Sequence, residues 1–386
     1  MRVPQFEYMK EVADANLVRF MKMGNAAAGN NGPYGQIDSP VRNSASYLIS
    51  YSYLYKITGN TKYLDACNVL FSYIKRMQSE SVSGAIKCME EDAFDYLNGL
   101  IGQAWVIDAL LSFYDASKDE DAIQIAKSIM NSQQYDFNTH LWHRIELDGT
   151  DIGIDYAYNH QVYFAASASR LLDYCYEKET DEIIKDFLIL GSKRDFRISR
   201  SGRLKHFVNV PMQSSFNKKA VDFIKRGIKL MLYPFRSLNL KKIDLGYQER
   251  GYQIFDLYGF KLLEGRYGHL PLFTSQKYKK AKEYALDLDA MNRRLGVNQS
   301  GRSGELNIYG YPYNSPAFEY PYVAGAERCS PEILDQLYQI RVEYMYDSNT
   351  RQFSKNNPDI ETFNARTYEI IRFLDESGIT ERLING

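Results

Sequence analysis

Stretches of apolar residues at helical spacing recur in pairs along the chain, and a short polar break separates the members of each pair. Residues 40–77 contain one such stretch up to Thr58, Gly59 and Asn60, and a second from Lys62 onward. Because residues three and four apart share one face of an α-helix, each pair predicts a hairpin of two amphipathic helices. The pattern returns at 97–134, 159–192, 247–286 and, more weakly, 316–346, with breaks at 116–118, 179–181 and 270–274 in the first three, and residues 364–376 predict a closing helix.

The first helix of each pair begins with polar and aromatic residues in close sequence. These starts are residues 39–47, 90–105, 158–164, 247–258 and 313–322. Repeated helical hairpins form either an open solenoid or a closed ring. In a closed ring, helix starts that point the same way converge on one pocket, which explains why carboxylates and amides are enriched there together. We therefore predict an all-α fold, an (α/α) toroid of six or seven helical hairpins, as a single domain over residues 1–386.

Two segments between the hairpins have the alternation typical of short strands. Residues 137–149 and 194–208 predict β-ribbons inserted into the toroid. If these ribbons cover the pocket, they bring His143, Arg144 or His206 to it.

The charge of the chain is close to neutral overall but uneven. The net charge is −1, yet residues 193–242 hold fourteen Lys or Arg and two Asp. This basic insertion contains an apolar stripe bordered by lysines, and residues 212–235 predict a basic amphipathic helix. Such a helix binds anionic membrane surfaces or anionic ligands, or else packs on the toroid with its lysines in solvent.

The spacing of the cysteines, the length of the apolar runs and the positions of the glycines exclude several classes of protein. The four cysteines, Cys67, Cys88, Cys175 and Cys329, have no paired spacing, so neither a disulfide framework nor a metal site is predicted. No stretch reaches about 18 apolar residues, and the first residues do not resemble a signal peptide. Gly99 and Gly102 follow no predicted strand, so no nucleotide cofactor is expected. We expect a cytoplasmic protein that uses no cofactor and binds no nucleic acid. If the basic helix binds anionic membranes, the protein is peripheral to the inner membrane face.

Residues 155–176 contain the polar-aromatic start from which we read the chemistry. Asn159, His160 and Gln161 lie among several aromatic residues, and an amphipathic helix follows them. A sugar presents hydroxyl groups at its edge and C–H groups on its face, so it suits side chains of this mixture. The alternative is a core helix in which His160 hydrogen-bonds a buried partner.

The hairpins with a Thr-Gly-Asn turn, together with NGLIGQAW at 98–105 and NHQVYFAA at 159–166, resemble the six- or seven-hairpin toroids of carbohydrate-active enzymes. That group includes alginate lyases, unsaturated glucuronyl hydrolases, glucuronyl C5-epimerases and proteins of surface-glycan clusters. The lyase pattern is Asn-Asn-His, one residue, then Tyr-Trp-Ala-Ala. Here Tyr158 replaces the first Asn and one residue is inserted, which rotates the aromatic pair by about 100° around the helix. The resemblance therefore carries over only to Asn159 and His160.

The candidate catalytic residues depend on the reaction. Elimination from a uronate needs a partner for the carboxylate, a base and an acid, which Asn159, His160, Tyr163 and an arginine supply. Arg42 and Arg250 are the candidate partners of the carboxylate, because a planar guanidinium matches it. Hydrolysis needs one or two carboxylates, for which the candidates are Asp92, Asp95, Glu249 and Glu319, with Asp92 and Glu319 preferred. Their alternative role is to stabilise helix starts. The predicted substrate-binding residues are the other polar residues of the helix starts: Arg42, Asn98, Gln103, Gln161, Glu249, Arg250, Tyr252 and Tyr320.

Taken together, these residues predict an enzyme that cleaves glycosidic bonds in an acidic, uronate-containing glycan by lyase chemistry. A hydrolase of the unsaturated glucuronyl type and a uronate C5-epimerase are the alternative enzymes. A glycan-binding protein without catalysis is the alternative from another class. The cytoplasmic location favours a small or lipid-linked glycan as the partner.

Overall fold

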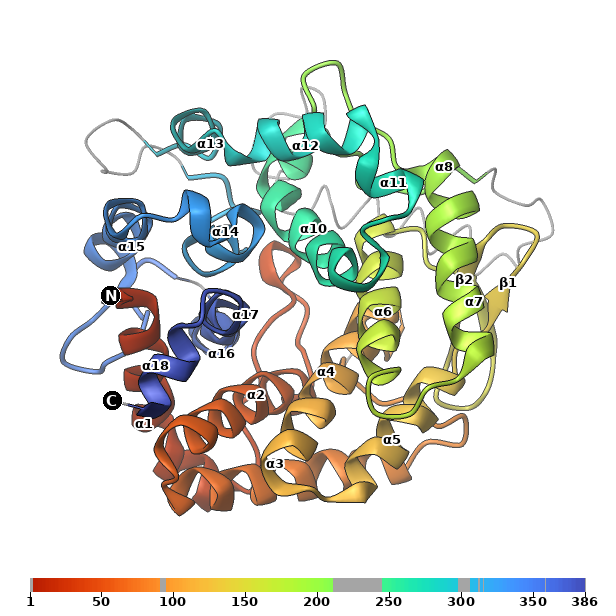
Figure 1. Cartoon of the computed structure of the whole chain (residues 1–386). Coiled ribbons are helices and arrows are strands. Elements are labelled where there is room, and N and C mark those ends of the chain that lie inside the picture. Colours follow the sequence, from red (N-terminus) through yellow and green to blue (C-terminus); the bar gives the residue numbers. More distant parts are fainter. Residues whose placement is uncertain are drawn as a thin grey trace.

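The computed structural model describes residues 3–90, 95–210, 245–297, 306–311, 313–314, 316–357 and 359–385. Within these ranges helices predominate, and a ring of inner helices surrounds the centre of the molecule (Figure 1). The inner ring consists of α2 (Pro40–Thr58), α4 (Gly99–Ser117), α6 (Tyr158–Leu171), α10 (Leu245–Tyr267), α14 (Pro316–Ala324) and a last segment made of α16 (Ile360–Ala365), η5 (Arg366–Ile370) and α17 (Ile371–Glu376). Each inner helix packs on the next, and α2 packs on η5, so the ring closes. The predicted α/α toroid is confirmed.

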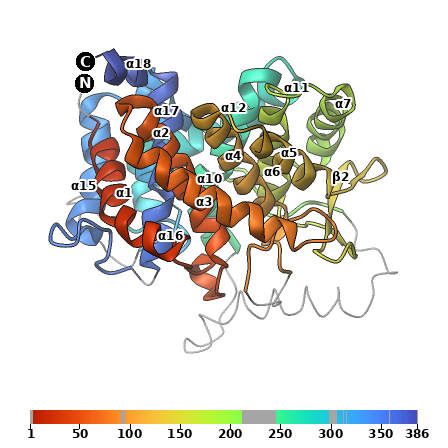
Figure 2. The same ribbon diagram turned by 90° about the horizontal axis from the view of Figure 1, so that it is seen from below.

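A second layer of helices covers the ring (Figure 2). This outer layer consists of α1 (Pro4–Met23), α3 (Thr61–Ser79), α5 (Glu120–Asn131), α7 (Lys178–Asp186), α12 (Gln276–Leu286) and α15 (Pro331–Met345). Helix α1 packs against both α15 and α3, and therefore joins the last outer helix to the first. Short elements complete the described fold: η1 (Gly32–Tyr34), η2 (Phe187–Gly191), α8 (Ser192–Asp195), α11 (Pro271–Thr274), α13 (Leu288–Arg294), η4 (Ala326–Arg328) and α18 (Ile379–Asn385).

The predicted breaks between the paired helices are mostly confirmed, for identifiable reasons. At the first break, Gly59 adopts the left-handed conformation that ends α2, and the Asn60 side chain accepts a hydrogen bond from the Lys62 amide at the start of α3. The break predicted at 179–181 is wrong. Helix α6 ends at Leu171 and α7 begins at Lys178, so residues 179–181 form the first turn of α7, where Glu179 and Asp181 favour a helix start.

The predicted ribbon near 137–149 is a three-stranded antiparallel sheet in the order β1-β2-β3. Strand β1 (Tyr135–Asp136) pairs with β2 (Leu141–Ile145), and β2 pairs with β3 (Asp151–Ile154). The second predicted ribbon, 194–208, has isolated bridges only, at Ile198 with Leu204 and at Phe207 with Ala157. Its first residues are helical instead, because they belong to α8.

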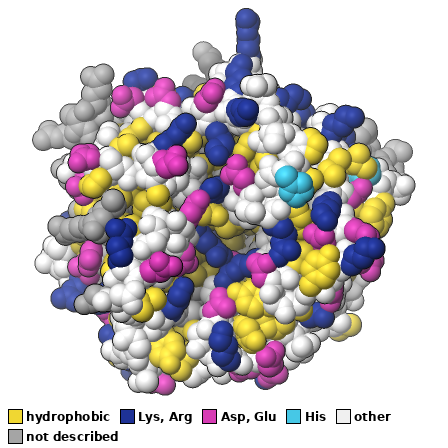
Figure 3. Space-filling model, in the orientation of Figure 1, with side chains coloured by type: hydrophobic (Ala, Val, Ile, Leu, Met, Phe, Trp, Pro, Cys, Tyr) yellow, Lys and Arg dark blue, Asp and Glu magenta, His cyan; other side chains and the backbone are white. Residues whose placement is uncertain are grey.

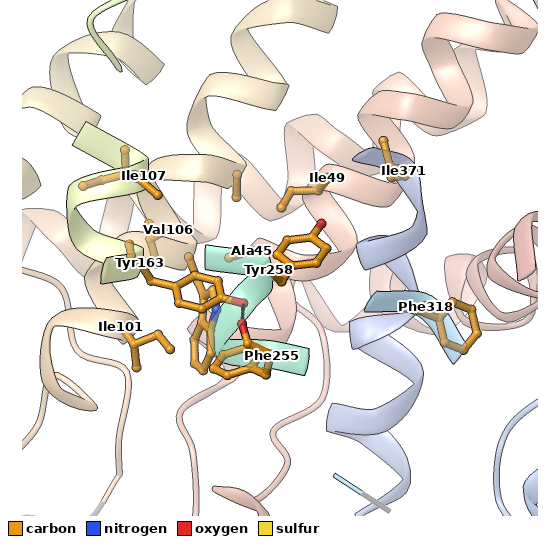
Figure 4. Packing of buried hydrophobic residues seen from close by; sticks show 14 of the residues in the cluster. Ala45, Ile49, Ile101, Val106, Ile107, Tyr163, Phe255, Tyr258, Phe318 and Ile371 are labelled. Atoms are coloured by element: carbon orange, nitrogen blue, oxygen red, sulfur yellow. Dashed lines mark hydrogen bonds between the residues drawn. The ribbon is translucent and has the colours of Figure 1, made fainter. Parts of the chain in front are cut away.

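Apolar side chains fill the middle of the ring (Figure 4). They come from every inner helix and are almost fully buried; Figure 4 labels Ala45, Ile49, Ile101, Val106, Ile107, Tyr163, Phe255, Tyr258, Phe318 and Ile371. The toroid is therefore not an open channel, and its two ends are separated by a packed core.

Two of the predictions concern residues outside the described part of the chain. They are Asp92 and the amphipathic segment 212–235 of the basic insertion. Among the helices that the structure does describe, none combines the length and apolar character needed to cross a membrane.

Candidate functional site

The amino-terminal ends of the inner helices meet at one end of the ring. Arg42, in the first turn of α2, donates from Nη1 to Asp38 over 2.5 Å and from Nη2 to the Tyr313 hydroxyl over 3.3 Å. Its guanidinium lies 4.4 Å from the ring centre of Trp105, on α4. Burial raises the pKa of Asp38 to about 6, against the opposing charge of Arg42. Three helix starts thus contribute side chains to one cluster.

The segment between α1 and α2 also enters this cluster. The Asn31 side chain donates to the Asn98 side chain over 3.2 Å, and its oxygen accepts from the Tyr313 hydroxyl over 3.2 Å. Tyr34 accepts a hydrogen bond of 2.9 Å from Gln248, in the first turn of α10. The segment therefore links the starts of α4, α10 and α14.

His160 and Asp155 form a hydrogen-bonded pair at the start of α6. Asp155 Oδ2 lies 2.8 Å from His160 Nδ1 and also accepts from the Leu100 amide over 2.9 Å. Burial alone would raise the pKa of Asp155, but the charge and hydrogen bond of His160 hold it well below its usual value. An ionised Asp155 keeps the proton of the neutral imidazole on Nδ1, so Nε2 has its lone pair available as a base.

The start of α4 is shaped to accept this pair. Gly99 has a φ of +60°, and a Cβ atom there would lie 2.3 Å from Asp155 Oδ2 and 2.5 Å from His160 Nδ1. Asp95 accepts from the Gly99 amide over 2.9 Å, and its other oxygen accepts from Arg144 over 2.8 Å. Only glycine provides both the conformation and the space at position 99.

A second histidine lies close to the pair. His206 is buried, and its main-chain oxygen accepts from the Tyr158 amide over 2.8 Å, next to the start of α6. Burial, followed by the charge of His160, lowers the pKa of His206 to about 3, so its imidazole is neutral at ordinary pH. Its ring centre is 4.8 Å from that of Tyr252, which lies within 6.2 Å of Tyr313. The imidazole of His206 therefore packs beside a set of aromatic rings, those of Tyr252 and Tyr313, which we call the aromatic wall.

Several buried polar atoms of this cluster have no hydrogen-bond partner among the described residues. They are Asp38 Oδ1, Asn98 Nδ2, Asn159 Nδ2 and His206 Nδ1. Buried polar groups are almost always hydrogen-bonded, by protein or by a bound molecule. Four such atoms at one end of the ring are what a site needs to bind a ligand rich in hydroxyl groups.

Positive charge borders the cluster on the side of α10. Glu249 accepts from Arg203 over 2.7 Å and from Lys205 over 3.3 Å, so two cations share one carboxylate. The predicted binding residue Arg250 follows Glu249 in α10, and its guanidinium lies 6.0 Å from the ring centre of Tyr247. Because the carboxylate of Glu249 neutralises only one of the two cations Arg203 and Lys205, one positive charge remains at this edge of the cluster.

Other predicted residues lie in the structure as parts of its framework. Gln161 bonds the Trp142 amide and carbonyl over 2.8 Å each, and Gln103 does the same to Ile86 over 2.8 and 2.9 Å. The Tyr163 hydroxyl donates to the Phe255 carbonyl, and the Tyr320 hydroxyl donates to the Leu286 carbonyl. These side chains bond the main chain of neighbouring segments, so their geometry gives them a role in packing.

Glu319 is fully buried and pairs with Arg366 over 2.7 Å. Arg366 also pairs with Glu369 over 2.7 Å, and its guanidinium lies 5.0 Å from the ring centre of Phe255. This arrangement ties Glu319 into the interior between α14 and η5. Removing one partner of such a pair leaves an uncompensated buried charge, so the geometry places Glu319 in the framework of the ring.

Sequence reasoning missed several residues of the cluster. The sequence pattern assigns no role to Asp155, Asp38, Asn31, Tyr34 and Trp105. Asp155 nevertheless precedes His160 by only five residues. A carboxylate shortly before a histidine is a signal that could have identified the pair. Of the ribbon residues, Arg144 and His206 reach the cluster, whereas His143 pairs with Asp151 over 2.9 Å on the sheet.

No protein-family model matches the chain. It is similar to archaeal glycosylation protein Q of Haloferax volcanii, with 27% identity over 373 residues, 94% of this chain and 95% of that protein. Among solved structures it resembles cellobiose 2-epimerase from Bacillus thermoamylovorans (TM-score 0.61, 13% identity, 95% and 98% of the two chains). It also resembles an unsaturated glucuronyl hydrolase from a Bacillus species (TM-score 0.60, 12% identity, 97% of each). These likenesses establish the α/α-toroid fold.

The buried His206 predicts a stability that falls with acid. Because its pKa drops from 6.5 to about 3 on folding, the unfolded chain binds the proton more readily between these values. Stability from this group is therefore present above about pH 6.5 and falls by about 1.4 kcal/mol per pH unit below it. In urea unfolding between about pH 7 and pH 5, we expect His206→Gln to lose less stability than the wild type. The control His269→Gln, at an exposed position, should lose as much stability as the wild type; equal acid sensitivity of all three proteins would contradict the assignment.

Proposed function

We propose that the cluster around His160 is the active site of a carbohydrate-active enzyme that removes a proton from a sugar carbon next to a carboxylate. The Asp155–His160 hydrogen bond of 2.8 Å carries this proposal. An imidazole oriented by a buried carboxylate is a general base, and the carboxylate stabilises the imidazolium that forms when the proton is taken. His160 is also the more accessible partner, with 24% of its side chain exposed against 6% for Asp155.

The neighbouring groups suit the charge that this step creates. Loss of the proton places negative charge on the sugar carboxylate, and neutral donors such as Asn159 and His206 can hydrogen-bond it. The surplus of positive charge where Arg203 and Lys205 share Glu249 favours an acidic sugar over a neutral one. The aromatic wall of Tyr252 and Tyr313 provides an apolar surface for the sugar face.

Elimination, which cleaves the glycosidic bond, is the first outcome that we propose for this proton transfer. Epimerisation, in which the proton returns on the other face, is the second, and the likeness to cellobiose 2-epimerase and other sugar epimerases supports it. The similarity to a glycosylation protein supports a glycan as the substrate. Hydrolysis through Glu319 has less support, because Arg366 neutralises that carboxylate in the interior.

Incubation with uronate-containing oligosaccharides in heavy water separates these reactions. Elimination produces an unsaturated uronate, seen as a rise in ultraviolet absorbance. Epimerisation leaves absorbance unchanged and places deuterium on a carbon of the recovered sugar, which mass spectrometry detects. Bond cleavage with neither signal means hydrolysis and would overturn the proposed proton transfer, as would the absence of any reaction across a panel of acidic glycans.

A further inference from the structure

A second charged site lies at the opposite end of the ring from His160. A cavity of about 510 Å³ opens there, and Figure 3 shows the central hollow with charged side chains around it. Its charged lining residues are Asp108, Arg170, Asp173, Arg266 and Arg372. Arg170 stands ten residues after His160 on the same helix, which at 1.5 Å per residue separates the two by about 15 Å. The apolar core of Figure 4 lies between them.

The centre of this cavity is a carboxylate shared by two arginines. Arg372 donates to Asp108 Oδ1 over 2.6 Å, and Arg170 bonds the same oxygen as well as the Asp108 main-chain oxygen, the latter over 2.9 Å. Burial alone would raise the pKa of Asp108, but the charges of Arg372 and Arg170 lower it, so the carboxylate stays ionised. Nearby, Arg266 pairs with Asp173. Arg170 also pairs with Asp115 over 3.4 Å, so three guanidinium groups face three carboxylates.

Arg372 retains capacity to bind a ligand. Among the described residues it donates one hydrogen bond, to Asp108, and 24% of its side chain is exposed although it lies deep in the ring. A guanidinium has five N–H donors in a planar fork that matches a carboxylate or a phosphate. The donors that Asp108 does not use are therefore available on the cavity side.

One glycine leaves open space beside the arginines. Gly265 lies in α10 and lines the cavity, and a Cβ atom added there would have no atom of the described residues within 4 Å. Tyr322, on α14, lies on the wall, and its ring packs 4.9 Å from that of Tyr258. The space beside the arginines is thus bounded by an aromatic ring and is of the size that holds a small organic molecule.

We propose that this cavity binds a small organic anion, whose phosphate or carboxylate group bonds Arg372 while its remainder lies beside Tyr322 and Gly265. The N–H donors of Arg372 that Asp108 does not use favour a ligand with a negative group. The site is separate from the cluster at His160, so the proposal does not depend on the reaction proposed there.

Isothermal titration calorimetry with four probes tests the proposal: inorganic phosphate, a hexose phosphate, a hexuronate and the neutral hexose, all at matched ionic strength. We expect the anions to bind and the neutral hexose not to bind. Stronger binding of the hexose phosphate than of the hexuronate identifies phosphate as the preferred group, and the reverse order identifies carboxylate. Absence of heat with all three anions would overturn the proposal.

Two variants locate the binding. Arg372→Gln removes the ligand's partner, and loss of a charged hydrogen bond weakens binding by about tenfold or more. Gly265→Leu fills the cavity, and its helix propensity favours folding, so it serves if Arg372→Gln does not fold. Both should lose anion binding, while Arg19→Gln, which removes a charge that pairs with Glu361 elsewhere, should retain it. Anion binding that survives Gly265→Leu but disappears in His160→Ala would place the ligand at the other end of the ring and refute the proposal.

Discussion

Replacing His160 by Ala is expected to lower turnover by about 10²-fold or more, the scale for removing a general base. Asp155→Asn should have an effect of similar size, because an amide at position 155 can donate to Nδ1 and thereby place the imidazole proton on Nε2. The base then lacks its lone pair on the substrate side. Steady-state kinetics on the substrate identified by the heavy-water experiment measures both effects, with far-ultraviolet circular dichroism to verify folding.

The chain contains a matched control for this pair. His140 and Asp186 also form a hydrogen bond of 2.7 Å between Nδ1 and a carboxylate oxygen, but they join β1–β2 to α7, away from the helix starts. Asp186→Asn should leave turnover nearly unchanged. If His160→Ala retains turnover while its melting temperature falls by several degrees, His160 has a structural role and the proposed active site is wrong.

The second large effect is expected from Gly99→Ala. Left-handed backbone costs a residue with a Cβ about 1–2 kcal/mol, and the new methyl group would in addition overlap Asp155 Oδ2 and His160 Nδ1. Relief of that overlap must move the carboxylate or the imidazole, at a further cost of about 1–3 kcal/mol. We therefore expect lower stability and, because the pair is displaced, a turnover close to that of Asp155→Asn.

Gly59→Ala separates the backbone effect from the steric one. Gly59 has a φ of +65°, nearly the same as Gly99, but no atom of the described residues lies within 4 Å of a Cβ built there. Its replacement should reduce stability by only about 1–2 kcal/mol and leave turnover intact. Equal effects of the two substitutions on turnover would mean that Gly99 does not hold the pair in place.

Local sequence determined much of the fold. The turn at Thr58, Gly59 and Asn60 ends one helix and begins the next with interactions among residues close in sequence, so its position could be predicted. The sequence pattern places the break after α6 too late, since the residues after Leu171 contain neither glycine nor proline to mark the helix end. Packing against neighbouring helices decides that boundary.

For the site, the sequence by itself identified the helix starts and Asn159 with His160, because polar and aromatic residues at the beginning of an amphipathic helix are a local pattern. Only the tertiary structure decided what each polar residue bonds. Gln161 and His160 are adjacent, yet Gln161 turns to the Trp142 main chain and His160 to Asp155. Likewise Glu319 meets Arg366, 47 residues away, and Arg42 meets Tyr313, 271 residues away. Closure of the ring creates these partners, and no local spacing in the chain encodes them.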